Sequence, residues 1–149
     1  MLTKDKIEND LKDAMRSGDD VKKRTLRMVL SNIKLAEVEK QESLEGGDLL
    51  AIIQKEVKSR QETIDEAQEA GRDSLVSSTQ AEIEVLEAYL PEPLSKEELE
   101  ELVSETISET GAEGPQDMGN VMKAIMPKIK GRADGKTVSS LVQKKLAGS

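Results

Sequence analysis

Apolar side chains recur every three or four residues along the first 90 positions, which is the spacing of amphipathic helices. The pattern predicts four helices, at residues 3–17, 20–42, 48–70 and 74–89. Gly18, Gly46-Gly47 and Gly71 separate them, and Asp48 is expected to cap the third. The short connections predict a small antiparallel helical bundle.

Each predicted helix has one stripe that is expected to face the core. The stripes are Ile7, Leu11 and Met15 in the first helix, Leu26, Val29, Ile33 and Ala36 in the second, Ile53, Val57 and Ile64 in the third, and Ile83, Leu86 and Leu90 in the fourth.

Two prolines interrupt the helical pattern between Leu90 and Leu94. Each proline fixes its own φ angle and disfavours the α conformation in the residue before it, so the segment is expected to be a stiff extended joint. We place the domain boundary here. The predicted organisation is an N-terminal helical domain of residues 1–90 and a second domain of residues 95–149.

The second domain is predicted to contain three short helices. Ser95 and Glu98 have the spacing of a capping box at the start of the first. The next is expected to start at Asp117 and to kink or end at Pro127. Asp134 is expected to cap the last. Because no strand pattern occurs, the predicted fold class is all-α.

Composition narrows the possible chemistry. The 149 residues include one aromatic side chain, Tyr89, and no Cys, His, Trp or Phe. The commonest general base and the usual zinc ligands are therefore missing, and base stacking on aromatic rings is nearly excluded. We expect no cofactor, no metal and no catalytic site. The absence of a long apolar run predicts a cytoplasmic protein that does not enter a membrane.

Charge is unevenly distributed along the chain. Residues 114–149 contain seven Lys or Arg and two Asp, a net charge of +5. The preceding 113 residues contain 15 basic and 28 acidic side chains, a net charge of −13. This split predicts a small basic module, held away from an acidic body by the proline joint, with a polyanion as its partner.

Five cations gather in that basic stretch and form the candidate RNA-binding site. On an α-helix, Lys123 and Lys130 would lie about 20° apart beside the apolar stripe, with Lys128 on the other flank. Arg132 and Lys136 bracket a glycine-flanked turn, and the backbone N–H groups of the next helix add donors. The set suits the phosphate backbone of a folded RNA. The alternative is that Lys123 and Lys130 only extend over the core.

Two other features are weaker signals. Lys22, Lys23, Arg24 and Arg27 form a second basic cluster, which nearby acids can neutralise. The segment Gly135-Lys136-Thr137 matches the end of a phosphate-binding P-loop, but the first glycine of that motif is displaced and no strand precedes it.

Four segments together resemble the GatB/YqeY family. They are Thr25–Lys34, Leu90–Ser95, Asp117–Lys123 and Met126–Lys136. The resemblance covers essentially the whole chain and is that of a stand-alone YqeY-like protein. One departure is Asn120, which stands where a basic residue is common in the family.

The resemblance implies a helical domain joined to a three-helix tail similar to the C-terminal domain of the GatB subunit of glutamine-dependent tRNA amidotransferase. In its hosts that tail is associated with tRNA binding, and the catalytic core of GatB is absent here. A carbon–nitrogen ligase activity with glutamine as amide donor would therefore be an attribution inherited from the larger enzyme. We expect a non-catalytic tRNA-binding or accessory protein. The alternative is a protein–protein adaptor that docks a tRNA synthetase or an amidotransferase.

Overall fold

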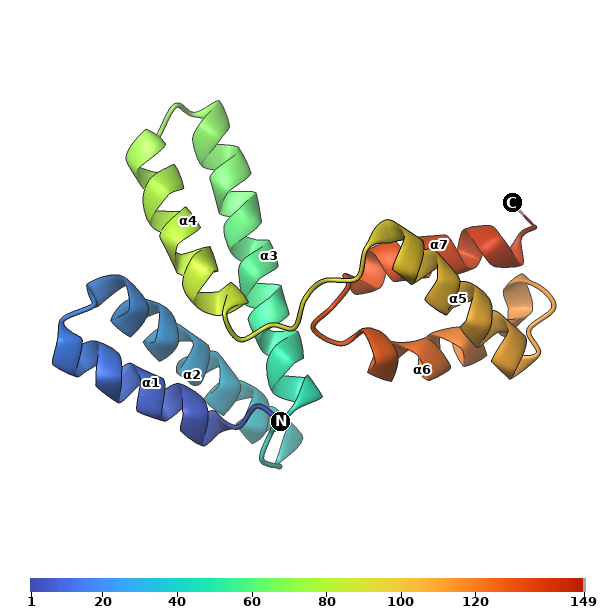
Figure 1. Cartoon of the computed structure of the whole chain (residues 1–149), viewed down its shortest axis with the longest axis horizontal. Helices are drawn as coiled ribbons and strands as arrows, with labels where there is room; N and C mark the ends of the chain where they lie inside the picture. Colours follow the sequence, from blue (N-terminus) through green and yellow to red (C-terminus); the bar gives the residue numbers. More distant parts are fainter. Residues whose placement is uncertain (149) are drawn as a thin grey trace. The chain divides into compact units, whose positions relative to one another are not determined.

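The computed structural model describes residues 1–148, which form seven α-helices, one short 3₁₀ helix and no strand. The all-α prediction is confirmed. The chain divides into two compact units, Met1–Pro91 and Glu92–Ser149, so the division falls within the proline-containing joint. Figure 1 shows the helices of each unit.

The first unit consists of two helical hairpins. Its helices are α1 (Lys4–Ser17), α2 (Asp20–Lys40), α3 (Gly47–Glu69) and α4 (Asp73–Glu87). Helices α1 and α2 form one hairpin and α3 and α4 the other, and α2 also packs against both helices of the second hairpin (Figure 1). All four predicted helices are present.

The helix ends follow local sequence signals, with one exception. Thr3 caps α1, and the Asp19 carboxylate accepts a hydrogen bond from the Lys22 backbone N–H at 3.0 Å at the start of α2. Gly18 has φ +75°, a left-handed conformation that a side chain would disfavour. The predicted cap at Asp48 is wrong. Helix α3 already begins at Gly47, so Asp48 lies in its first turn, where a negative charge still favours the helix dipole.

The core of the first unit is made of aliphatic side chains. It is centred on Ile7, Leu26, Val29, Ile33, Leu44, Leu49, Ile53 and Leu86, and Tyr89 packs at its edge. One predicted core residue is wrong. Met15 is 52% exposed, whereas Ala14 is buried. Seven residues bring a helix within about 20° of its starting direction and eight residues leave it about 80° away, so Ala14 lies under Ile7 and Met15 does not.

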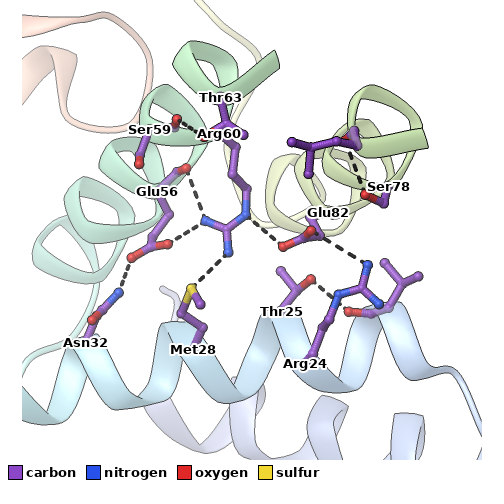
Figure 2. A network of polar contacts seen from close by, with 12 residues as sticks. Arg24, Thr25, Met28, Asn32, Glu56, Ser59, Arg60, Thr63, Ser78 and Glu82 are labelled. Carbon is purple, nitrogen blue, oxygen red and sulfur yellow. Dashed lines mark hydrogen bonds and ion pairs between the residues drawn. The ribbon is translucent and has the colours of Figure 1, made fainter. Parts of the chain in front are cut away.

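A buried arginine connects three helices of the first unit (Figure 2). Arg60 of α3 is 7% exposed, and its guanidinium lies 2.5 Å from a Glu56 carboxylate oxygen and 3.2 Å from a Glu82 carboxylate oxygen on α4. It also approaches the sulfur of Met28 on α2 at 3.3 Å, and Asn32 of α2 donates to Glu56. The network therefore fixes how the two hairpins meet.

The second unit contains α5 (Lys96–Thr110), a 3₁₀ turn (Pro115–Asp117), α6 (Met118–Ile129) and α7 (Gly135–Leu146). Its core is centred on Leu99, Val103, Val121, Ile125, Ile129, Val138, Val142 and Leu146. The predicted capping box is present, because Ser95 accepts from the Glu98 N–H at 3.1 Å and Glu98 accepts from the Ser95 N–H at 3.2 Å.

Two details of the second unit differ from the prediction. Asp117 closes the 3₁₀ turn, so α6 begins one residue later. The helix then continues through Pro127 and ends at Ile129. A proline in the last turn is tolerated here because the helix stops before many more bonds depend on that position.

The end of the proline joint is tied to the second unit. The Leu94 N–H donates to the Arg132 carbonyl at 2.9 Å, and the Arg132 Nε donates to the Glu92 carbonyl at 3.0 Å. These two bonds fix the backbone from Glu92 to Leu94 against the turn between α6 and α7.

Candidate nucleic-acid interface

The compact units change the predicted division of charge. Helix α5 is strongly acidic and belongs to the same unit as the basic helices α6 and α7. The unit Glu92–Ser149 holds eight basic and ten acidic residues, a net charge of −2, and Met1–Pro91 holds 14 basic and 20 acidic residues, a net charge of −6. The prediction of a basic module separated from all of the acidic chain is therefore wrong. The charge boundary lies inside the second unit.

Helix α6 carries two exposed lysines that differ in their surroundings. Lys128 makes an ion pair with Glu109 of α5 at 2.9 Å, with side chains 38% and 62% exposed. Such a pair is worth about 0–1 kcal/mol and exchanges readily for another anion. Lys123 is exposed, and its side chain makes no ion pair with any of residues 1–148.

Lys130 and Arg132 lie in the turn after α6, and both are half-buried. Lys130 is outside the helix, with ψ 124°, so the predicted helical alignment with Lys123 is wrong. It already interacts with other residues of the chain. The Arg132 Nε is bound to the Glu92 carbonyl. These two cations therefore have structural roles in addition to any contact with an anion.

Lys136 stands in the first turn of α7 and is exposed, again without an ion pair among residues 1–148. The neighbouring Asp134 caps this helix and accepts from the Lys136 backbone N–H at 3.5 Å. One of the backbone donors that the sequence offered to a phosphate is thus already used. The Asp134 carboxylate also places a negative charge between Arg132 and Lys136.

The cations near the N-terminus are mostly neutralised. Lys23 lies 3.6 Å from Asp20, and Arg24 lies 3.7 Å from Glu82. Lys22 is half-buried. Arg27 is exposed and makes no ion pair among the described residues.

Sequence reasoning missed an apolar cleft of about 570 Å³ in the second unit. Pro93, Leu94, Leu99 and Leu141 contribute its apolar lining. Lys96, Arg132 and Lys144 stand among the lining residues as cations. The alternation of Leu and Pro in the joint was the signal, but the cleft exists only because the joint is bound to Arg132.

The first unit has a cleft of about 590 Å³ that Asp10 and Tyr89 line together. The Tyr89 hydroxyl donates to the Asp10 carboxylate at 2.5 Å. Burial and this bond both raise the pKa of Tyr89. Burial opposes ionisation of Asp10, but hydrogen bonds from Lys6 and Tyr89 outweigh it, so the pKa of Asp10 is lowered.

Neither cleft has the ligands of a metal centre, because no group of three or more carboxylates converges anywhere in residues 1–148. No helix in that range is both long and apolar enough to cross a bilayer.

A family model for Yqey-like protein matches residues 4–146. The chain belongs to the YqeY-like family. This finding agrees with the resemblance to the GatB/YqeY family in the sequence and covers both compact units of this YqeY-like protein.

Relatives of two kinds are similar to this YqeY-like chain. A protein of Pyrenophora tritici-repentis named altered inheritance of mitochondria protein 41, mitochondrial, is 35% identical over 141 residues, which span 93% of this chain and 77% of the relative. Its namesake in Eremothecium gossypii is 39% identical over 85 residues, 56% of this chain and 46% of the relative. A component of the glutamyl-tRNA(Gln) amidotransferase of Thermococcus gammatolerans, its E-type polypeptide, is 42% identical over 57 residues, 36% of this chain and 9% of that polypeptide.

Proposed function

We propose that this YqeY-like protein binds tRNA without catalysing a reaction on it, as an accessory of tRNA aminoacylation or amidation. The observation that carries the proposal is the pair of exposed lysines without ion pairs among residues 1–148, Lys123 on α6 and Lys136 on α7, with Lys128 held only by an exposed pair. The similarity to one component of a tRNA amidotransferase supports the choice of RNA. A cytosolic location is part of the same proposal.

The number of available cations sets the strength of binding that we expect. Three to five cations on phosphates give a slope of log affinity against log salt of roughly −2.5 to −4. Affinity should therefore fall about 30- to 250-fold between about 50 and 200 mM salt. Lys130 and Arg132 are already engaged, which favours the weaker end of this range.

The test is a titration of unfractionated tRNA with the full chain at low salt, followed by fluorescence anisotropy. The triple variant K123E/K128E/K136E should lose most of the affinity and flatten the salt slope. The matched control K12E/K55E changes two exposed lysines of the first unit and should bind as the natural chain does. Undetectable binding by the natural chain, or equal losses in both variants, would contradict the proposal.

A second variant tests the role of α5 directly. E109Q removes the partner of Lys128 and one negative charge from the unit. We expect tighter tRNA binding, by about two- to fivefold at low salt, because one more cation becomes available. Weaker binding would mean that the ion pair positions Lys128 productively.

The second candidate function is an adaptor that docks a tRNA synthetase or an amidotransferase. The cleft beside α7 favours it, because Leu94, Leu99 and Leu141 expose apolar surface with cations around it. In this case, a captured enzyme should remain bound after nuclease treatment and in high salt. L141E should release the enzyme while leaving tRNA binding unchanged.

A further inference from the structure

The outward face of α2 is unusually apolar for a helix at the surface of a charged protein. Thr25, Leu26, Val29 and Ile33 direct the opposite face into the core. On the outward side, Met28, Leu35 and Val38 are 53%, 63% and 68% exposed. Contiguous apolar side chains of this kind mark interaction sites rather than ordinary solvated surface.

Charge changes sign along the same helix. From Val21 to Ala36, α2 has five cations and no acid, although the first unit carries a net charge of −6. From Glu37 to Glu45 there are four acids, of which Glu39 and Glu42 are exposed. The side chains of Arg27, Glu39 and Glu42 form no ion pair among residues 1–148.

An apolar centre between a basic end and an acidic end is complementary to itself under a twofold axis. When two such helices lie antiparallel, the apolar centres meet and each basic end faces the acidic end of the other copy. A parallel arrangement would instead place like charges opposite each other. Twofold pairing of one patch with itself is also the commonest symmetry of soluble oligomers.

We propose that the face of α2 containing Arg27, Met28, Leu35, Val38 and Glu42 pairs antiparallel with the same face of a second copy of this chain. Met28 also contacts Arg60 of the buried network, so the edge of this face is fixed by the core of the unit (Figure 2). The pairing does not depend on tRNA binding, because α2 belongs to the first unit and the proposed tRNA-binding lysines belong to the second.

Sedimentation velocity of the full chain, at concentrations up to about 500 µM, tests the pairing, since a single-helix interface buries little area and associates weakly. The natural chain should show a reversible dimer. R27E and E42R should each weaken it by at least about tenfold, because the axis repeats each like-charge contact. V38K should abolish it. The control E69R, at an exposed acid of α3, should leave it unchanged.

Mixing provides the decisive result. A 1:1 mixture of R27E and E42R restores opposite charges at both ends of the antiparallel pair, so it should dimerise more strongly than either variant alone. Helical content by circular dichroism confirms that each variant is folded. The proposal is wrong if the natural chain stays monomeric, if the variants dimerise as it does, or if the mixture is no stronger than its components. A heterologous protein would then be the better occupant of this face.

Discussion

Replacing Arg60 by methionine should destabilise the first unit far more than replacing a surface arginine. Methionine keeps most of the apolar volume and removes the guanidinium. Glu56 and Glu82, whose side chains are only 14% and 18% exposed, would then lie close together without their shared cation. Removing one partner of a buried ion pair costs about 3–5 kcal/mol. We expect about 3 kcal/mol, because both carboxylates keep some contact with water.

The sole aromatic residue makes the assay selective. Tyr89 packs against the core of the first unit, so its fluorescence reports the unfolding of that unit in urea. At a slope of about 1.5 kcal/mol per molar, a loss of about 3 kcal/mol lowers the midpoint by about 2 M. R16M is the matched control, since Arg16 and its partner Asp13 are 79% and 67% exposed, and it should cost at most about 0.5 kcal/mol.

A compensating variant separates lost charge pairing from lost packing. R60M/E56Q/E82Q removes the uncompensated carboxylates along with the cation and should recover at least half of the lost stability. The reasoning is refuted if R60M is as mild as R16M. It is also refuted if the triple variant is no more stable than R60M, because packing would then explain the whole effect.

Two further predictions concern single hydrogen-bonded pairs. Y89F removes the donor to Asp10 and should cost about 1–2 kcal/mol near neutral pH. Because the pKa of Asp10 is lowered by folding, its contribution is present above the pKa of the unfolded chain and is lost as the pH falls through the folded value. The penalty of Y89F, measured by circular dichroism in urea, should therefore shrink in acid, and a pH-independent penalty would contradict this. S95A removes the cap of α5 and should cost about 1 kcal/mol, seen as faster amide exchange in α5 but not in α1–α4. Because hydrogen bonds from Ser95 lower the pKa of Glu98, that pKa should rise in S95A, and an unchanged NMR titration would contradict the assignment.

Local patterns predicted the helices well because their signals are local. Thr3, Asp19 and Ser95 each act within four residues, and the structure places all three as caps. Helix α6 shows the limit of such rules. Proline was expected to kink or end it, and the packing of Ile125 and Ile129 in the core favours two more residues of helix after Pro127.

Contacts between distant residues could not be predicted in this way. Arg60 reads as a surface residue on its own helix, and its burial depends on Glu82, 22 positions later. The candidate site shows the same limit. Lys128, Lys130 and Arg132 were predicted as free cations, but their partners lie on α5, in the proline joint or elsewhere in the chain. Of the five predicted cations, all within the described part of the chain, Lys123 and Lys136 keep the free exposure expected from their sequence.

The position of α5 determines how the second unit could meet an anion. Packed helices lie about 8–10 Å apart, and the Debye length at physiological salt is about 8 Å. The acids of α5, which packs against both α6 and α7, therefore weaken the attraction of the lysines over most of the physiological range. They also make approach from the α5 side unfavourable. An anionic polymer is consequently attracted to one side of the unit and repelled from another. In this arrangement α5 contributes to the orientation of a bound RNA, while α6 and α7 supply the attraction.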